Sequence, residues 1–231
     1  MDKTFLFPLR VKRLFRLFFL LLATLLFALC FSACSKETDY FSFVSENRSN
    51  IFLCKTEDFS LKIHAVEREN PYSPDGVPRE SSPRTEVFLI AAETTDAPVL
   101  TLIVNGKEFG GDMSFDNAKA EYYYSCTLDV SHLASIPVRL EYKGTMVETN
   151  AVSVKTQTSL SSREILFSAI NAEREKINTL TDKNGFAGEF YIRLISEDGL
   201  YYYVGIIDRN GKVLSMLLSA ESGKVLAKRE A

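Results

Sequence analysis

VGIIDRNGKVLSMLLSAESGKVL, residues 204–226, contains two turn signals, NG at 210–211 and SG at 222–223, between apolar runs. A third signal, DG at 198–199, precedes the stretch, so that the three glycines stand twelve residues apart. Dipeptides of this kind mark tight turns, and equal spacing indicates strands of similar length that fold back on one another. The stretch therefore predicts an antiparallel β-meander with strands at about 188–196, 200–208, 212–220 and 224–228.

The residues in front of this meander have helical periodicity. Ser161 and Glu164 have the spacing of a capping box, in which each side chain accepts from the backbone N–H of the other residue. After them, apolar residues recur on one helix face, at Ile165, Leu166, Ala169, Ile170, Ile177 and Leu180. The pattern predicts one amphipathic helix that ends near Thr181 and covers one face of the meander.

The helix and the paired strands, about 70 residues together, resemble PepSY domains. The resemblance rests on the D-x-x-G-K-V turn at 208–213 and the A-x-x-G-K-V turn at 220–225. It implies a small extracytoplasmic module that binds or restrains partners such as peptidases, and it supplies no catalytic residues. An unrelated domain with the same layout is the alternative.

Residues 50–155 have the pattern of seven or eight short strands. Apolar and polar residues alternate at 59–65, 122–130 and 138–143, and NG at 105–106 predicts a tight hairpin. Residues 128–142 resemble the passage between the last strands of an immunoglobulin-like domain. The predicted fold is therefore mainly β with an α+β C-terminal part: an antiparallel Ig-like β-sandwich at 50–155, then one helix on an antiparallel meander at 156–231.

The N-terminal segment has the layout of an export signal. Its basic residues are followed at 17–33 by an uncharged apolar run, and Cys34 comes directly after Phe31-Ser32-Ala33. This border resembles a bacterial lipobox, although Phe31 stands where leucine is usual. The resemblance implies that residues 1–33 are removed and that the Cys34 thiol is diacylated. Residues 35–49 are mostly polar, which predicts that 34–49 is a tether. An uncleaved membrane helix and a plain secretion signal are the alternatives.

The charge of the chain constrains its partners. The leader holds five of the 27 basic and one of the 30 acidic residues, which leaves 22 basic and 29 acidic residues and a net charge of −7. Such a balance disfavours nucleic acid as a partner. The expected partners are the membrane, through the lipid on Cys34, and a protein or glycan of the bacterial cell envelope.

Two cysteines lie beyond Cys34, at Cys54 and Cys126. Outside the cytoplasm they could form a disulfide, and two buried free thiols are the other interpretation.

The stretch ENPYSPDGVPRESSP, residues 69–83, contains four prolines and one glycine and so predicts a loop. Tyr72 and Arg79 would be its partner-binding residues if it faces a ligand. The second interpretation is a plain exposed strand connection.

No motif for catalysis, metal binding or nucleotide binding stands out, and no cofactor is predicted. The two histidines, His64 on the polar face of a strand and His132 in a turn, have no ligand companions at close spacing. We expect a non-enzymatic lipoprotein at the outer face of the cell membrane that acts as a binding or accessory module. The alternatives are a hydrolase of cell-wall glycan or peptide built from scattered carboxylates, and an extracytoplasmic sensing subunit.

Overall fold

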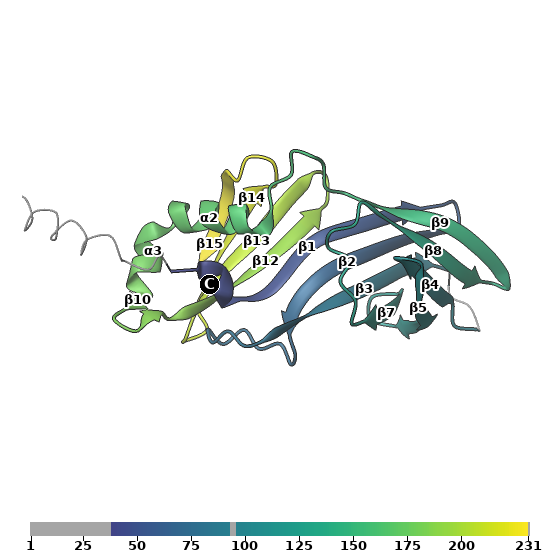
Figure 1. Ribbon diagram of the computed structural model, residues 1–231, viewed down its shortest axis with the longest axis horizontal. Coiled ribbons are helices and arrows are strands. Elements are labelled where there is room, and N and C mark those ends of the chain that lie inside the picture. The colour runs from purple at the N-terminus through teal and green to yellow at the C-terminus, as the bar shows by residue number, and fades with distance from the viewer. Residues whose placement is uncertain (1–37, 93–95, 231) are drawn as a thin grey trace, which may run out of the picture. The chain divides into compact units, whose positions relative to one another are not determined.

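The computed structural model describes residues 38–92 and 96–230. Strands make up most of this part of the chain, and two short helices precede the last of them (Figure 1). The elements in chain order are η1 (Tyr40–Phe43), β1 (Val44–Lys55), β2 (Phe59–Glu69), β3 (Ser81–Ala91), β4 (Val99–Val104), β5 (Lys107–Asp112), β6 (Ser114–Asp116), β7 (Glu121–Cys126), β8 (Ser135–Tyr142), β9 (Thr145–Ser153), α2 (Ser162–Ala172), α3 (Arg174–Thr179), β10 (Thr181–Asp182), β11 (Gly185–Phe186), β12 (Gly188–Ser196), β13 (Leu200–Asp208), β14 (Val213–Ser219) and β15 (Val225–Glu230).

One sheet runs through both halves of the chain. Nine of its strands follow one another in the order β15-β14-β13-β12-β1-β2-β3-β7-β6. Strands β5, β4, β8 and β9 form a second layer, which joins the first where β9 pairs with β1 at Phe52 and Leu53. Neighbouring strands are antiparallel except β1 and β12, which are parallel. The mainly β, largely antiparallel fold expected from the sequence is confirmed.

The meander has the strands that its glycine spacing predicted. Strands β12 and β13 have the predicted bounds, and β14 and β15 differ from them by one or two residues. The NG hairpin is also present between β4 and β5. Asn105 and Gly106 both have positive φ, 51° and 73°, as a two-residue turn that continues the twist of its strands requires.

The capping box at the start of the helix is confirmed. The Glu164 backbone N–H donates to Ser161 Oγ, and the Ser161 backbone N–H donates to Glu164 Oε2 at 2.8 Å. The prediction of one unbroken helix is wrong, because Glu173 has φ −122° and ψ 36° and separates α2 from α3. The chain changes direction there, and Ile177 still reaches the core (Figure 1).

Two hydrophobic cores form on the sheet. The first lies in the sandwich, where Phe52, Leu61 and Leu89 from one layer meet Leu100 and Leu140 from the other. The second lies between the helices and the meander, and its fully buried residues include Ile165, Ala169, Phe190, Ile192, Leu194 and Tyr202. Burial of a side chain of this size stabilises the fold by about 1.5–3 kcal/mol.

Part of the segment predicted as a tether, 34–49, has regular structure. Residues 40–43 form a 3-10 helix, and β1 begins at Val44. The polar sequence at 45–48 is typical of a linker. These residues form a strand because the Glu46 carboxylate, although buried, is paired with Arg193 on β12.

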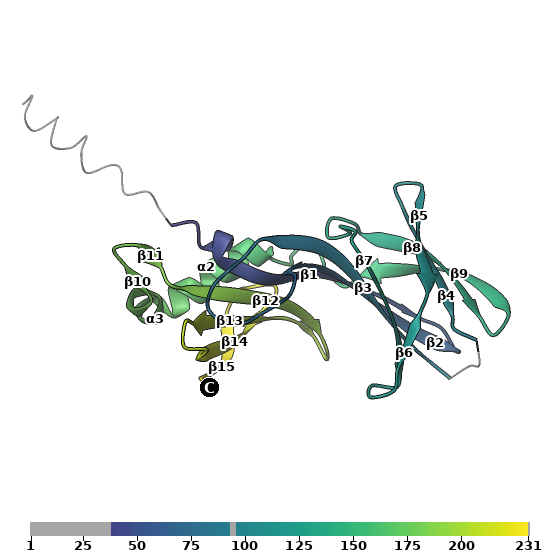
Figure 2. The ribbon, with the colours of Figure 1, turned by 90° about the horizontal axis from the view of Figure 1, so that it is seen from below.

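Both cores lie on the same side of the sheet. Figure 2 shows α2 together with β8 and β9 above strands β1–β3. In the part of the chain that the structure describes, the other face of β1, β2, β3 and β12 carries no helix or second sheet. The loop between β2 and β3 covers part of this face at β12, and the face carries the charged residues described below.

Candidate binding face

Charged side chains gather on the face of the sheet opposite the two cores. Glu46 on β1 is opposite Arg68 on β2, and Arg48 on β1 is opposite Arg193 on β12. Residues directly opposite one another on neighbouring strands point to the same side of a sheet. We call Glu46, Arg48, Arg68, Glu86 and Arg193 the arginine face.

Two of the three arginines are bound to carboxylates. Arg193 Nε and Nη2 donate to the two carboxylate oxygens of Glu46, at 3.0 and 2.6 Å. Burial lowers the pKa of Arg193, but the hydrogen bonds and charge of Glu46 outweigh burial and raise it overall. Arg68 Nη2 donates to Glu86 Oε1 at 2.8 Å. Both carboxylates of the arginine face are thereby neutralised by a neighbouring strand.

Arg48 is the third arginine, and it makes no ion pair with any residue that the structure describes. Its Nε is buried and has no hydrogen-bond acceptor. Burial lowers the pKa of its guanidinium, Glu46 and Glu86 raise it, and Arg193 and Arg68 lower it. A guanidinium keeps its charge at neutral pH, so Arg48 places an unmatched positive charge on this face.

Arg48 lines a groove of about 780 Å³. Arg68, Glu86 and the rings of Phe88 and Tyr123 line it as well, and the turn between β6 and β7 contributes residues 117–119. The Phe88 and Tyr123 rings lie 5.3 Å apart between centroids. The groove thus combines a cation with an apolar aromatic wall, as many ligand sites do.

His64 is buried beside this groove, against the expectation from its place on a polar strand face. Its ring packs against Phe88 at 4.9 Å between centroids, and 8% of the residue is exposed. Burial, followed by the charges of Arg48 and Lys62, lowers the pKa of His64 to about 3. The imidazole is therefore neutral and adds no charge to the groove.

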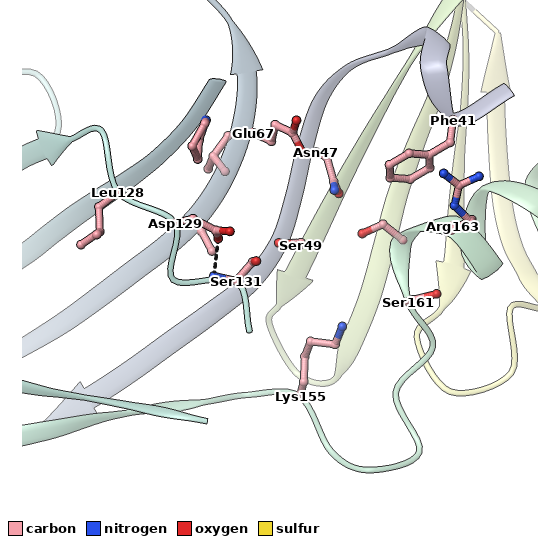
Figure 3. A pocket seen from close by; sticks show the side chains of 14 residues that line it. Phe41, Asn47, Ser49, Glu67, Leu128, Asp129, Ser131, Lys155, Ser161 and Arg163 are labelled. Atoms are coloured by element: carbon pink, nitrogen blue, oxygen red, sulfur yellow. Dashed lines mark hydrogen bonds between the residues drawn. The ribbon is translucent and has the colours of Figure 1, made fainter. Parts of the chain in front are cut away.

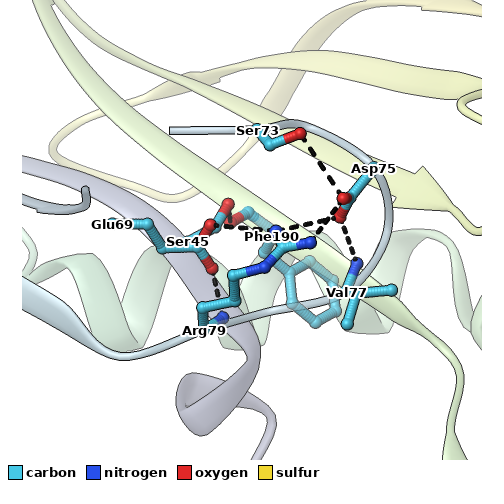
Figure 4. Close-up of polar contacts among 7 residues, drawn as sticks. All are labelled: Ser45, Glu69, Ser73, Asp75, Val77, Arg79 and Phe190. Carbon is cyan, nitrogen blue, oxygen red and sulfur yellow. Dashed lines mark hydrogen bonds and ion pairs between the residues drawn. The ribbon is translucent and has the colours of Figure 1, made fainter. Parts of the chain in front are cut away.

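The loop that joins β2 and β3 packs against the meander (Figure 4). A Cβ on Gly76, which has φ +77°, would lie 2.4 Å from the backbone oxygen of Asp208, so no larger residue fits there. Arg79 donates to the Asp75 carboxylate at 2.6 and 3.2 Å, and its backbone N–H donates to Glu69. The loop is held by its own contacts rather than being a loose connection.

The structure separates the two residues predicted to bind a partner through this loop. The Arg79 side chain is partly exposed to solvent, and its guanidinium is already paired with Asp75 and Glu69. Tyr72 is half-buried, with the guanidinium carbon of Arg68 6.0 Å from its ring centroid. Tyr72 thus adjoins the arginine face, whereas Arg79 does not belong to it. A role of either residue in binding stays a prediction.

Three carboxylates lie close together at this loop: Glu69 at the end of β2, Asp75 in the loop and Glu189 on β12. Glu189 on β12 is fully buried, and neither of its oxygens meets a side-chain donor among the described residues. Burial and the carboxylates of Glu69 and Asp75 raise the pKa of Glu189 to about 7, against smaller opposing effects of the Gly76 N–H and Arg79. The folded protein thus holds a proton on Glu189 that the unfolded chain releases at lower pH.

Glu189→Gln is expected to remove a pH dependence of stability. Because folding raises this pKa, the stabilisation from the bound proton is complete below pH 4.5 and is lost as pH rises through about 7. The variant should match the wild type at pH 4 and exceed its free energy of unfolding by about 3 kcal/mol at pH 8. Urea unfolding at both pH values measures this difference, with the exposed Glu197→Gln as control. Equal stability of wild type and variant at pH 8 would contradict it.

A second pocket, of about 510 Å³, lies on the helix side of the sheet (Figure 3). It is lined by residues from the start of α2 and by the segment 128–131. Its Arg163 is already paired with Asp39 at 2.8 Å and lies over the Phe41 ring. Burial lowers the pKa of Lys155 in this pocket, and the charge of Glu164 raises it by a smaller amount. Because its arginine is neutralised, this pocket is a weaker candidate than the arginine face.

The disulfide considered between Cys54 and Cys126 is not formed, and both thiols are free. Cys54 is on β1 and Cys126 on β7, and strands β2 and β3 lie between them. Three strand spacings amount to about 14 Å, whereas a disulfide needs Cα atoms within about 7 Å. The sheet order therefore excludes the pairing.

The predicted lipidation site Cys34 and the predicted leader 1–33 lie outside the described residues. Within 38–92 and 96–230, no helix has the length and apolar character needed to cross a bilayer. The same residues contain no group of three or more histidine, cysteine, aspartate or glutamate side chains placed to hold a metal ion.

Comparison of the chain with protein-family models, with curated proteins and with solved structures gives no match. The proposals below therefore rest on the residues and their geometry alone.

Proposed function

We propose that the chain is a non-enzymatic binding module of the bacterial cell envelope, held at the outer face of the membrane by a lipid on Cys34. The observation that carries the binding role is the unpaired Arg48 in a groove walled by Phe88 and Tyr123. An uncompensated, partly desolvated charge costs stability, and such a cost is typical of a functional site. The apolar leader that ends at Cys34 supports the location.

Cys34→Ser is expected to abolish incorporation of labelled palmitate and to leave the leader uncleaved. Lipidation needs the thiol, and processing at a lipobox follows acylation of the cysteine. Metabolic labelling followed by gel electrophoresis and mass spectrometry of the N-terminus measures both effects. Cys30→Ser is the matched control because Cys30 lies in the same apolar run, and it should label normally. Normal labelling of the Cys34 variant would refute the anchor.

A hydrolase of cell-wall glycan or peptide is the second candidate, and Glu189 favours it. A carboxyl with a pKa near 7 beside a second carboxylate suits a general acid. Against this, Glu189 is inaccessible because Gly76 and its loop cover it, so a substrate would have to displace the loop. The test is release of soluble fragments from isolated cell wall. Release by the wild type that is abolished in Glu189→Gln would show a hydrolase rather than a binding module.

A further inference from the structure

We propose that the groove of the arginine face binds a peptide carboxylate, with the carboxylate on Arg48 and the adjoining aliphatic side chain against Phe88 and Tyr123. The inference rests on the proposed binding function and specifies its ligand class. Three observations carry it: the absence of an ion pair at Arg48, the burial of its Nε and the packing around the Phe88 ring.

Arg48 is the one cation lining the groove that forms no ion pair. The lining contains three cations and three carboxylates: Glu86 pairs with Arg68, and Asp116 and Glu121 share Lys119, whose Nζ lies 3.9 and 3.6 Å from them. A planar carboxylate fits a guanidinium with two parallel hydrogen bonds, which makes this pair stronger and more specific than most.

The burial of Arg48 increases the value of such a pair. Its Nε is shielded from water and lacks an acceptor, and the neighbouring Arg68 and Arg193 are each committed to a glutamate. Hydrogen bonds to a charge are stronger where water is excluded, because the local dielectric constant is lower. Arg48 is thus suited to bind a carboxylate that adjoins an apolar group, which would exclude water from the pair.

The packing around Phe88 favours an aliphatic side chain over a sugar ring. The ring is contacted by His64 and by Tyr123, at 4.9 and 5.3 Å between centroids, and Lys119 Nζ lies 5.9 Å from its centroid. Sugars bind by stacking on a free aromatic face. The three neighbours of the Phe88 ring leave little room for such stacking. An aliphatic group needs only the tilted edges of Phe88 and Tyr123, which meet at 48°.

Titration calorimetry on the full chain in detergent micelles tests the proposal with N-acetyl-L-leucine as probe. We expect measurable binding, and at least tenfold weaker binding of N-acetyl-L-leucinamide, which lacks the carboxylate. Arg48→Ala should weaken binding of the acid about tenfold or more. Arg209→Ala, which removes the same charge at an exposed turn, should leave it unchanged.

Four outcomes decide against the proposal. Equal affinity for acid and amide would overturn it, and so would tighter binding of methyl β-D-glucuronide or inorganic phosphate. Undiminished binding by Arg48→Ala would also overturn it. If Arg48→Ala does not fold, Arg48→Lys carries the comparison, because it keeps the charge and loses the paired geometry. If the probe does not bind but palmitate labelling still depends on Cys34, the carboxylate site is refuted and the anchor is not. If labelling does not depend on Cys34, the anchor is refuted and the carboxylate site is not.

Discussion

Replacing Phe190 by alanine is expected to lower the free energy of unfolding by about 4 kcal/mol. Phe190 is fully buried in the core under the helices, where its ring stacks on Phe186 at 4.9 Å and meets the edge of Tyr40 at 6.2 Å. Truncation removes these contacts and leaves a cavity that β12, hydrogen-bonded to both β1 and β13, is poorly placed to close. Equilibrium urea unfolding followed by circular dichroism measures the change.

Phe167→Ala is the matched control for this substitution. Phe167 is on α2 and is 62% exposed, so its loss should change the free energy of unfolding by less than about 0.5 kcal/mol. A loss below 1 kcal/mol for Phe190→Ala would mean that this core does not form as described.

Replacing Arg193 by alanine is expected to lower the free energy of unfolding by about 3 kcal/mol. Glu46, 2% exposed, would keep a buried charge without its bidentate partner. The loss should exceed that of Arg139→Ala, because Arg139 pairs with the exposed Glu108 and an exposed pair contributes about 1 kcal/mol at most.

A double variant separates the buried charge from the lost packing of Arg193. Replacing Glu46 and Arg193 together by leucine should recover most of the stability, since no charge is then left buried. Thermal or urea unfolding of the single and double variants completes the cycle. If Arg193→Ala costs no more than Arg139→Ala, the buried ion pair does not stabilise the β1–β12 junction.

The local parts of the fold could be predicted from the sequence. The turns at 198–199, 210–211 and 222–223 set the meander, because each needs a residue that tolerates positive φ close to the end of an apolar run. The capping box of Ser161 and Glu164 likewise depends on residues three positions apart. Signals of this range are contained in the sequence and do not require knowledge of the rest of the fold.

The arginine face could not be predicted, because its residues meet only across strands. The parallel pairing of β1 with β12 joins residues separated by more than 140 positions, as the Glu46–Arg193 pair shows. Polar residues at 45–48 lack the alternation that marks a half-buried strand, since the ion pair makes burial of Glu46 tolerable. Locally, the sequence shows only that Glu46 and Arg48 are two positions apart and so would share one face of a strand. This spacing does not indicate which strand lies beside them.

The sequence predicts Tyr72 and Arg79 as binding residues because they lie in a proline-rich loop, and the structure gives them different environments. Arg79 is engaged by Asp75 and Glu69, whereas Tyr72 lies next to Arg68. Composition identified the loop but could not show that Gly76 packs against Asp208, a contact that fixes the loop on the meander.

Capture of partner proteins by the chain after cross-linking in intact cells tests the binding role of the arginine face most directly. The binding role of the arginine face predicts that a partner cross-linked to the wild type is also recovered with Arg209→Ala and is lost with Arg48→Ala. Recovery of the same partner in the same amount with a folded Arg48→Ala variant would contradict it.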